Sequence, residues 1–228
     1  QLMMASATKE FVEKELDPHR EQFEKKDYQL TEDCMKKAGE LGLLGISVPA
    51  EYGGMGMPFN TSVLICDKIS GANGSFSTAF GAHTGIGTLP ILLYGNDEQR
   101  KKYLPKLATG EWMGCYCLTE PGAGSDANSG KTKAVLTKDG KNYLITGQKM
   151  WISNAGFADV FIVFARIEND KNITGFILEK EMEGITMGEE EYKLGLNSSS
   201  TRQVFFNDVK VPVESMLGGR GNGFKIAM

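Results

Sequence analysis

Histidine is scarce in this sequence, with only His19 and His83 among 228 residues. A Ser-His-Asp triad or a multi-histidine metal site therefore has almost no raw material. Cysteine is also rare, at positions Cys34, Cys66, Cys115 and Cys117. Four cysteines in so long a chain do not suggest a disulfide framework. The last two are two apart in a strand-like run and should share one face, but no further soft ligand lies nearby for zinc. We expect no metal site.

Long apolar runs are missing as well. The longest, such as Val160 to Ala165, are far shorter than the roughly 20 residues of a membrane span, and no signal-peptide pattern opens the chain. The formal net charge is −4 with both signs interspersed, which argues against a nucleic-acid interface. We therefore expect a globular protein whose partner is a small molecule or another protein. The expected compartment is reducing: bacterial cytoplasm, or the mitochondrial matrix after removal of a transit segment.

The first half of the chain has the apolar spacing of helices. We predict helices up to Asp17-Pro18, from a cap at Thr31 to Leu41, and over residues 60–70, 75–83 and 97–107. The last of these has Asn96 as its cap and closes at Thr109-Gly110. Residues 1–111 are therefore predicted to form an all-α domain.

From Trp112 onward the pattern changes to seven short β-rich runs with no helix between them, and Asp139-Gly140 predicts a two-residue hairpin. Residues 112–214 are thus predicted to form an antiparallel β-barrel or sandwich, which gives an α+β chain. After Pro212, LGGRGNG is typical of a linker, and FKIAM of the start of a helical third domain, so 215–228 is expected to lead into a part outside this piece.

The segment CLTEPGAGSD at residues 117–126 combines two acids, a proline and two glycines after a strand-like run. Gly122 and Gly124 remove the Cβ atoms that would keep a ligand from the main chain, and the hydroxyls of Thr119 and Ser125 add polar groups. Composition alone leaves open whether this loop holds a ligand, supplies Glu120 as a catalytic carboxylate, or merely connects two strands.

A second segment, QKMWISN at residues 148–154, contains one of only two tryptophans. Trp151 can offer a flat face to a planar heteroaromatic ring, and Ser153, two residues on, should lie on the same side of the strand. A tryptophan buried in a β-core is the competing interpretation.

Together, CYCLTEPGAGSD and KMWISNAGFADVF, about 30 residues apart behind an all-α domain, resemble the acyl-CoA dehydrogenase family. The resemblance covers nearly the whole chain, and GAHTGIG, LPILLYGN and GFILEKEMEGIT look most like its very-long-chain branch. It implies three domains, with FAD between the β-barrel and a C-terminal helical bundle that is missing here. By position, the flavin-facing residues would be Tyr116, Cys117, Leu118, Thr119, Gly124, Ser125, Trp151, Ile152 and Ser153.

The resemblance also implies the reaction: a carboxylate removes the α-proton of an acyl-CoA thioester while hydride leaves for the flavin, giving a trans-2-enoyl-CoA. Ser125 would lie near the thioester. The family's base belongs to the bundle beyond Met228, so no catalytic residue is assigned in this chain, and Glu120 is expected to be scaffold that accepts N–H bonds or pairs with a basic side chain. Electrons would pass to an electron-transfer flavoprotein, and the full-length protein is expected to be a homo-oligomer.

The acyl chain is expected between the helical domain and the barrel, where Gly81, Ala82, Gly85 and Gly87 leave room for a long tail or simply allow tight helix packing. An acyl-CoA oxidase, a dehydrogenase for short, branched or dicarboxylic acyl groups, and a non-catalytic binding or assembly relative stay as alternatives. This piece alone is expected to be inactive and to hold FAD weakly or not at all. Membrane association stays open.

Overall fold

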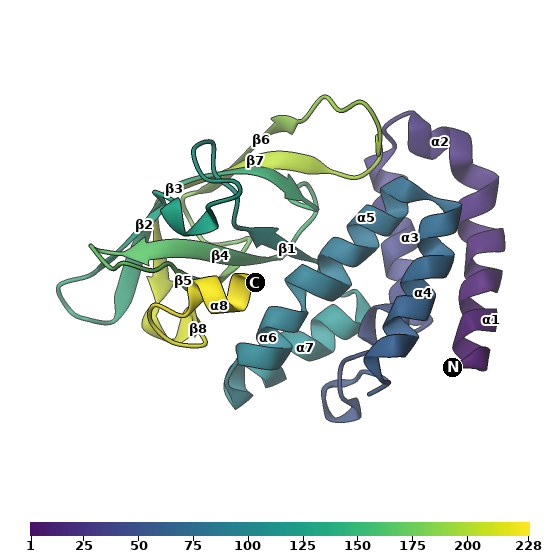
Figure 1. Cartoon of the computed structure of the whole chain (residues 1–228), viewed down its shortest axis with the longest axis horizontal. Helices are drawn as coiled ribbons and strands as arrows, with labels where there is room; N and C mark the ends of the chain where they lie inside the picture. Colours follow the sequence, from purple (N-terminus) through teal and green to yellow (C-terminus); the bar gives the residue numbers. More distant parts are fainter.

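The computed structural model describes residues 1–228 and places a helical half beside a β-sheet half, with both termini marked in Figure 1. The helices are α1 (Leu2–Phe11), α2 (Arg20–Glu24), α3 (Tyr28–Glu40), α4 (Phe59–Ala72), α5 (Gly74–Gly81), α6 (Leu89–Tyr94), α7 (Asp97–Thr109) and α8 (Gly223–Ala227). Short π-helical turns continue α1 (Val12–Leu16) and α5 (Ala82–Gly87). None of these helices combines the length and the apolar character that crossing a membrane requires.

The start of α3 corrects one predicted cap. Asp27, not Thr31, caps this helix, because the Asp27 carboxylate accepts the backbone N–H of Leu30 at 2.9 Å. Thr31 lies inside the helix, is buried, and donates its hydroxyl to the carbonyl oxygen of Ser198 at 2.8 Å. Its side chain therefore links the helical half to the segment before β7.

The predicted cap of α7 is confirmed. Asn96 accepts the N–H of Gln99 at 2.8 Å, and the Gln99 side chain accepts the N–H of Asn96 at 3.0 Å, which is a reciprocal capping box. Gly110 closes the helix with a φ of 77°, a conformation that favours glycine. Helix α6 was not predicted, because its six residues are too few to show helical periodicity.

The seven predicted β runs all form strands. They are β1 (Gly114–Cys117), β2 (Lys133–Leu136), β3 (Asn142–Ser153), β4 (Val160–Ile167), β5 (Thr174–Glu179), β6 (Ile185–Glu190) and β7 (Thr201–Pro212). A short eighth strand, β8 (Met216–Leu217), lies in the stretch predicted as linker. The β2–β3 hairpin is present, but its connection is the five residues 137–141 rather than two.

The sheet itself corrects the prediction of an antiparallel barrel. Its strand order is β6-β7-β3-β2-β4-β5-β8, with β1 also paired to β4, so the sheet is open: its path ends at β6 and β8. Both β1 and β2 pair with β4 in parallel, whereas the remaining pairs are antiparallel. The parallel pairs join strands far apart in sequence, and hairpin signals between neighbouring runs carry no information about such pairs.

Strand β4 is the centre of the packing. Phe161 and Val163 point into a core formed within the sheet half, while Ile162 and Phe164 pack against α7 and α8. Both faces of β4 are therefore buried, and β1, which pairs with it, has little freedom to move. The loop that leaves β1 at Cys117 starts from a fixed position.

Candidate functional site

The loop after β1 folds into a tight turn. Glu120 and Ala123 exchange backbone hydrogen bonds of 3.0 and 3.1 Å. Gly122 and Gly124 are exposed, and a Cβ placed on either would meet no atom within 4 Å. The main chain of this turn therefore faces open space, so a ligand can approach it closely.

Glu120 points the other way, into the protein, and is 7% exposed. Its carboxylate accepts the backbone N–H of Lys131 at 2.6 Å and that of Thr132 at 3.1 Å. It also pairs with Lys149, whose Nζ lies 2.7 Å from Oε1. Both oxygens of this carboxylate thus help to hold the loop, as expected for scaffold.

Lys149 is the residue that sequence reasoning missed. Its side chain is buried, and besides Glu120 it donates to the carbonyl oxygen of Leu118 at 3.1 Å. Burial lowers the pKa of Lys149 while the Glu120 charge partly offsets that effect. Burial tends to raise the pKa of Glu120, but Lys149 and the two N–H donors outweigh it, so the net pKa is lowered. The lowered pKa of Glu120 favours its ionised form, which accepts the bond from Lys149. The sequence around Lys149 contains several polar residues, so it does not indicate that this lysine is buried.

Trp151 is not buried in a β-core, which excludes the competing interpretation: the residue is 61% exposed. It lies where the register of β3 against β7 shifts between Lys149 and Ile152, and its φ is 58°, in the left-handed region. An aromatic residue in the left-handed backbone conformation costs free energy. Within a β-bulge, it directs its side chain away from the hydrogen-bonded strand pair. Exposure still alternates beyond the bulge, with Ile152 buried and Ser153 half-buried. That Ser153 shares the face of Trp151 stays a prediction.

A backbone hydrogen bond joins the two segments, in addition to the side-chain bonds of Lys149. The backbone N–H of Met150 donates to the carbonyl oxygen of Thr119 at 2.9 Å. The bulge that carries Trp151 thus lies directly beside the loop that carries Thr119 and the two glycines. The structure brings together two motifs that stand about 30 residues apart in the sequence.

The other predicted site residues divide by exposure. Thr119 and Ser153 are half-buried and Ser125 is exposed, so their hydroxyls can meet a ligand. The side chains of Cys117 and Ile152 are buried in the sheet core, so only their main chain can face a ligand. The side chains of Tyr116 and Leu118 pack instead against the core that α7 and α8 form with Ile162 and Phe164 of β4.

Asn154 follows these residues and fixes the end of the bulge. It is fully buried, has a φ of 66°, and donates from Nδ2 to the carbonyl oxygen of Ala79 on α5 at 2.9 Å. Its backbone N–H donates to Ser200 at 2.9 Å. Asn154 therefore joins the end of β3 to both the helical half and the segment before β7.

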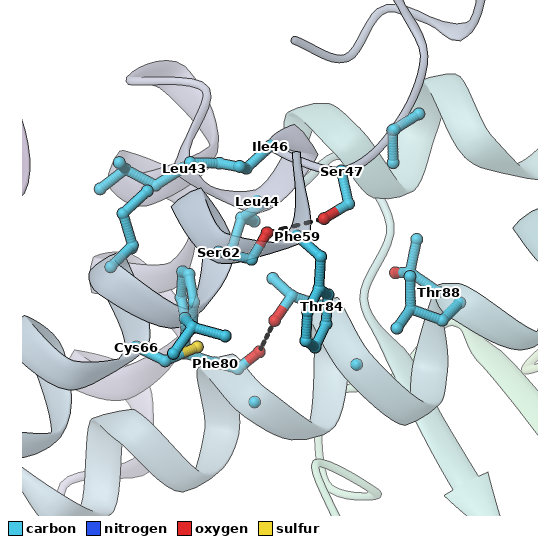
Figure 2. Close-up of a pocket in the computed structure, with 16 residues that line it drawn as sticks. Leu43, Leu44, Ile46, Ser47, Phe59, Ser62, Cys66, Phe80, Thr84 and Thr88 are labelled. Carbon is cyan, nitrogen blue, oxygen red and sulfur yellow. Dashed lines mark hydrogen bonds between the residues drawn. The ribbon is translucent and has the colours of Figure 1, made fainter. Parts of the chain in front are cut away.

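An apolar cavity of about 220 Å³ lies within the helical half. Figure 2 shows its walls, formed by the connector after α3, by α4, and by α5 with its π-helical turn. Gly81 and Gly85 line it, and a Cβ at either would meet no atom within 4 Å, whereas Ala82 and Gly87 are not among the lining residues. Two of the four small residues thus open the cavity. The cavity lies among helices. The path of the acyl chain between the helical domain and the sheet stays a prediction.

Comparisons with known proteins agree with this architecture. Residues 1–111 match the model of the acyl-CoA dehydrogenase N-terminal domain, and residues 115–209 match that of its middle domain. The chain belongs to the acyl-CoA dehydrogenase family. It is 49% identical over 225 residues to a probable acyl-CoA dehydrogenase of Bacillus subtilis, covering 99% of this chain and 38% of that protein. A crystal structure of a Bacillus anthracis acyl-CoA dehydrogenase complexed with FAD has 48% identity and a TM-score of 0.95, covering 99% of this chain and 39% of that one.

Relatives of more than one chain-length class match. The human mitochondrial very long-chain specific enzyme is 46% identical over 198 residues, covering 83% of this chain and 30% of that protein. The short-chain specific enzyme of Clostridium acetobutylicum is 39% identical over 231 residues, covering 100% of this chain and 60% of that protein. The chain therefore spans 30% to 60% of the length of these relatives. The resemblance to the very-long-chain branch does not by itself define a substrate.

Proposed function

We propose that this chain forms the helical and β-sheet part of an FAD and acyl-CoA site in an acyl-CoA dehydrogenase. The observation that carries the proposal is the 2.9 Å hydrogen bond from Met150 to Thr119, because it places an exposed tryptophan beside an open, glycine-containing loop. A flat aromatic face next to hydroxyls and accessible main chain suits a planar ring system with polar edges.

The residues present fit FAD. The exposed face of Trp151 can pack against the flavin ring, and the half-buried hydroxyls of Thr119 and Ser153 can donate to its polar edge. Gly122 and Gly124 leave the loop's main chain accessible. FAD, when bound, accepts the hydride that leaves the β-carbon of the acyl group. Ser125, exposed at the end of the loop, is proposed to lie beside the thioester.

The base that removes the α-proton is proposed to come from outside residues 1–228. Glu120, one of the two acids within this loop, is engaged by Lys149, Lys131 and Thr132 and has a lowered pKa, so it is a poor proton acceptor. The chain's own contribution is to hold the loop and Trp151 in fixed positions around the reacting atoms.

The apolar cavity is proposed to receive the acyl tail, and its open positions at Gly81 and Gly85 favour long chains. We further propose an electron-transfer flavoprotein as electron acceptor and a homo-oligomeric full-length enzyme. Turnover of C4, C8 and C16 acyl-CoA by the full-length protein, with an artificial electron acceptor, tests this function. We expect trans-2-enoyl-CoA as product, with C16 faster than C4. No enoyl product from any of the three would overturn the proposed function, and a maximum at C4 would overturn the chain-length assignment.

A further inference from the structure

Lys149 is the one lysine that lies buried in this molecule, at 1% exposed. An ammonium group removed from water is costly unless it is paired and hydrogen-bonded. Replacing a buried ion pair by apolar side chains of similar volume is often neutral or stabilising, so stability alone does not account for a Lys149–Glu120 pair. The position of the pair offers a better account.

The Lys149 ammonium bonds to both sides of the turn that holds Thr119. It donates to the carbonyl oxygen of Leu118 at 3.1 Å and to the Glu120 carboxylate at 2.7 Å. The next residue, Met150, donates its backbone N–H to Thr119 at 2.9 Å. Three consecutive residues of the loop, 118–120, are therefore bonded to two consecutive residues of β3, immediately before Trp151.

Trp151 needs such support. Its left-handed φ of 58° is unfavourable for a residue with a Cβ, and such conformations persist only where the surroundings impose them. The register of β3 against β7 runs without a shift from Gly147 to Lys149 and resumes at Ile152, so this bulge is confined to Met150 and Trp151. Lys149 is the last residue before the bulge, and its side chain holds that end of the strand to the loop.

We propose that Lys149, with Glu120 as its counter-ion, is a positioning residue that sets the distance between the Thr119 loop and the Trp151 face. This inference rests on the proposed flavin site and deepens it. Lys149 itself touches no ligand, because its ammonium group lies beneath the loop, on the side away from solvent.

The main test variant combines Glu120→Gln with Lys149→Met and removes both charges. The double change is needed because Lys149→Met alone leaves a buried, unpaired carboxylate and can fail to fold. Lys149→Arg retains the charge, and Lys133→Met, an exposed lysine on β2, is the matched control. FAD affinity is measured in the full-length protein. Fluorescence anisotropy of Trp151 is measured in the 228-residue chain carrying Trp112→Phe, which leaves a single tryptophan.

We expect the double variant to unfold cooperatively, yet to bind FAD roughly tenfold to a hundredfold more weakly, as for a misplaced binding group. The fluorescence anisotropy of Trp151 should be lower than in the wild type even at denaturant concentrations at which the variant is still folded. A role of Lys149 in global stability alone would not produce this change. Lys149→Arg should recover part of both signals, and Lys133→Met should alter neither. Wild-type affinity or unchanged anisotropy in the folded double variant would overturn this inference alone. A wild-type full-length protein that binds no FAD would overturn the proposed site as well.

Discussion

The imidazole of His83 joins the helical half to the first residue of β1: the backbone N–H of Gly114 donates to its Nδ1 at 3.0 Å. Because Nδ1 accepts, the proton lies on Nε2, which donates to the carbonyl oxygen of Leu107 at 2.9 Å. His83 is fully buried, and burial lowers its pKa from 6.5 to about 4. A protonated ring could not accept from Gly114, so the neutral form is the one that holds β1 against the helices.

This arrangement predicts a loss of stability on acidification. The unfolded chain protonates His83 below pH 6.5, whereas the folded chain does so only near pH 4. The stabilisation by neutral His83 is therefore complete above pH 6.5 and is lost as the pH falls toward 4. The difference amounts to about 3 kcal/mol of unfolding free energy. Urea denaturation at pH 7 and pH 4.5 measures it.

Carboxylates also titrate in this window, so the comparison is between variants. His83→Gln retains a donor and an acceptor but has no proton to gain, and we expect it to lose much less stability on acidification than the wild type. His19→Gln, at the half-buried second histidine, should behave like the wild type. An equal acid-induced loss in His83→Gln and wild type would show that another group is responsible.

The close contact between Gly87 and Gly114 predicts that alanine is tolerated less well at Gly87 than at Gly81. A Cβ on Gly87 would lie 2.9 Å from the carbonyl carbon of Gly114 and 3.0 Å from the carbonyl oxygen of Ala82. Gly87→Ala should therefore destabilise the protein by about 1–3 kcal/mol, as overpacking does. Gly81→Ala, on the preceding helix, where a Cβ meets nothing within 4 Å, should be neutral or slightly stabilising. Equal effects in chemical denaturation would show that the close approach of the backbone at Gly87 to that at Gly114 does not constrain the packing of the helical half on β1.

The cavity predicts a shift in chain-length preference. Gly85 lines the cavity, so the side chain of Gly85→Leu would fill part of it. In the full-length enzyme we therefore expect this variant to lower kcat/KM for C16 acyl-CoA about tenfold or more relative to C4. Gly71→Leu is the matched control, because Gly71 lies on α4 with nothing within 4 Å of a Cβ and does not line the cavity. If both variants change the C16-to-C4 ratio alike, the cavity does not hold the acyl tail.

Much of the fold could be predicted because its signals are local. The capping box at Asn96, the seven β runs and the change from helix to strand near residue 112 each depend on neighbours within a few positions. The mixed sheet could not, because the parallel pairs of β4 join runs tens of residues apart. Asp27 and Thr31 are both good capping residue types, so the sequence alone does not decide which of them caps α3. Tertiary structure decides it, because the Thr31 hydroxyl bonds to Ser198 and Asp27 accepts the N–H of Leu30.

The candidate site follows the same division. The ligand-facing composition of the 117–126 loop and the importance of Trp151 could be read from residue types. The left-handed conformation of Trp151, the burial of Lys149 and the links of Asn154 to α5 could not, because each depends on tertiary packing. These three features are also the ones that fix where the predicted ligand-facing residues lie.

Equilibrium titration of the flavin-free full-length protein with FAD tests the central claim most directly, with Trp151→Ala beside Trp112→Ala as the matched control. Trp112 packs on Tyr103 and Lys106, away from the Thr119 loop. We predict one FAD bound per chain in the wild type, affinity at least about tenfold weaker in Trp151→Ala, as expected for loss of a large aromatic contact, and near wild-type affinity in Trp112→Ala. Equal affinity of the two tryptophan variants, or no binding by the wild type, would contradict the account.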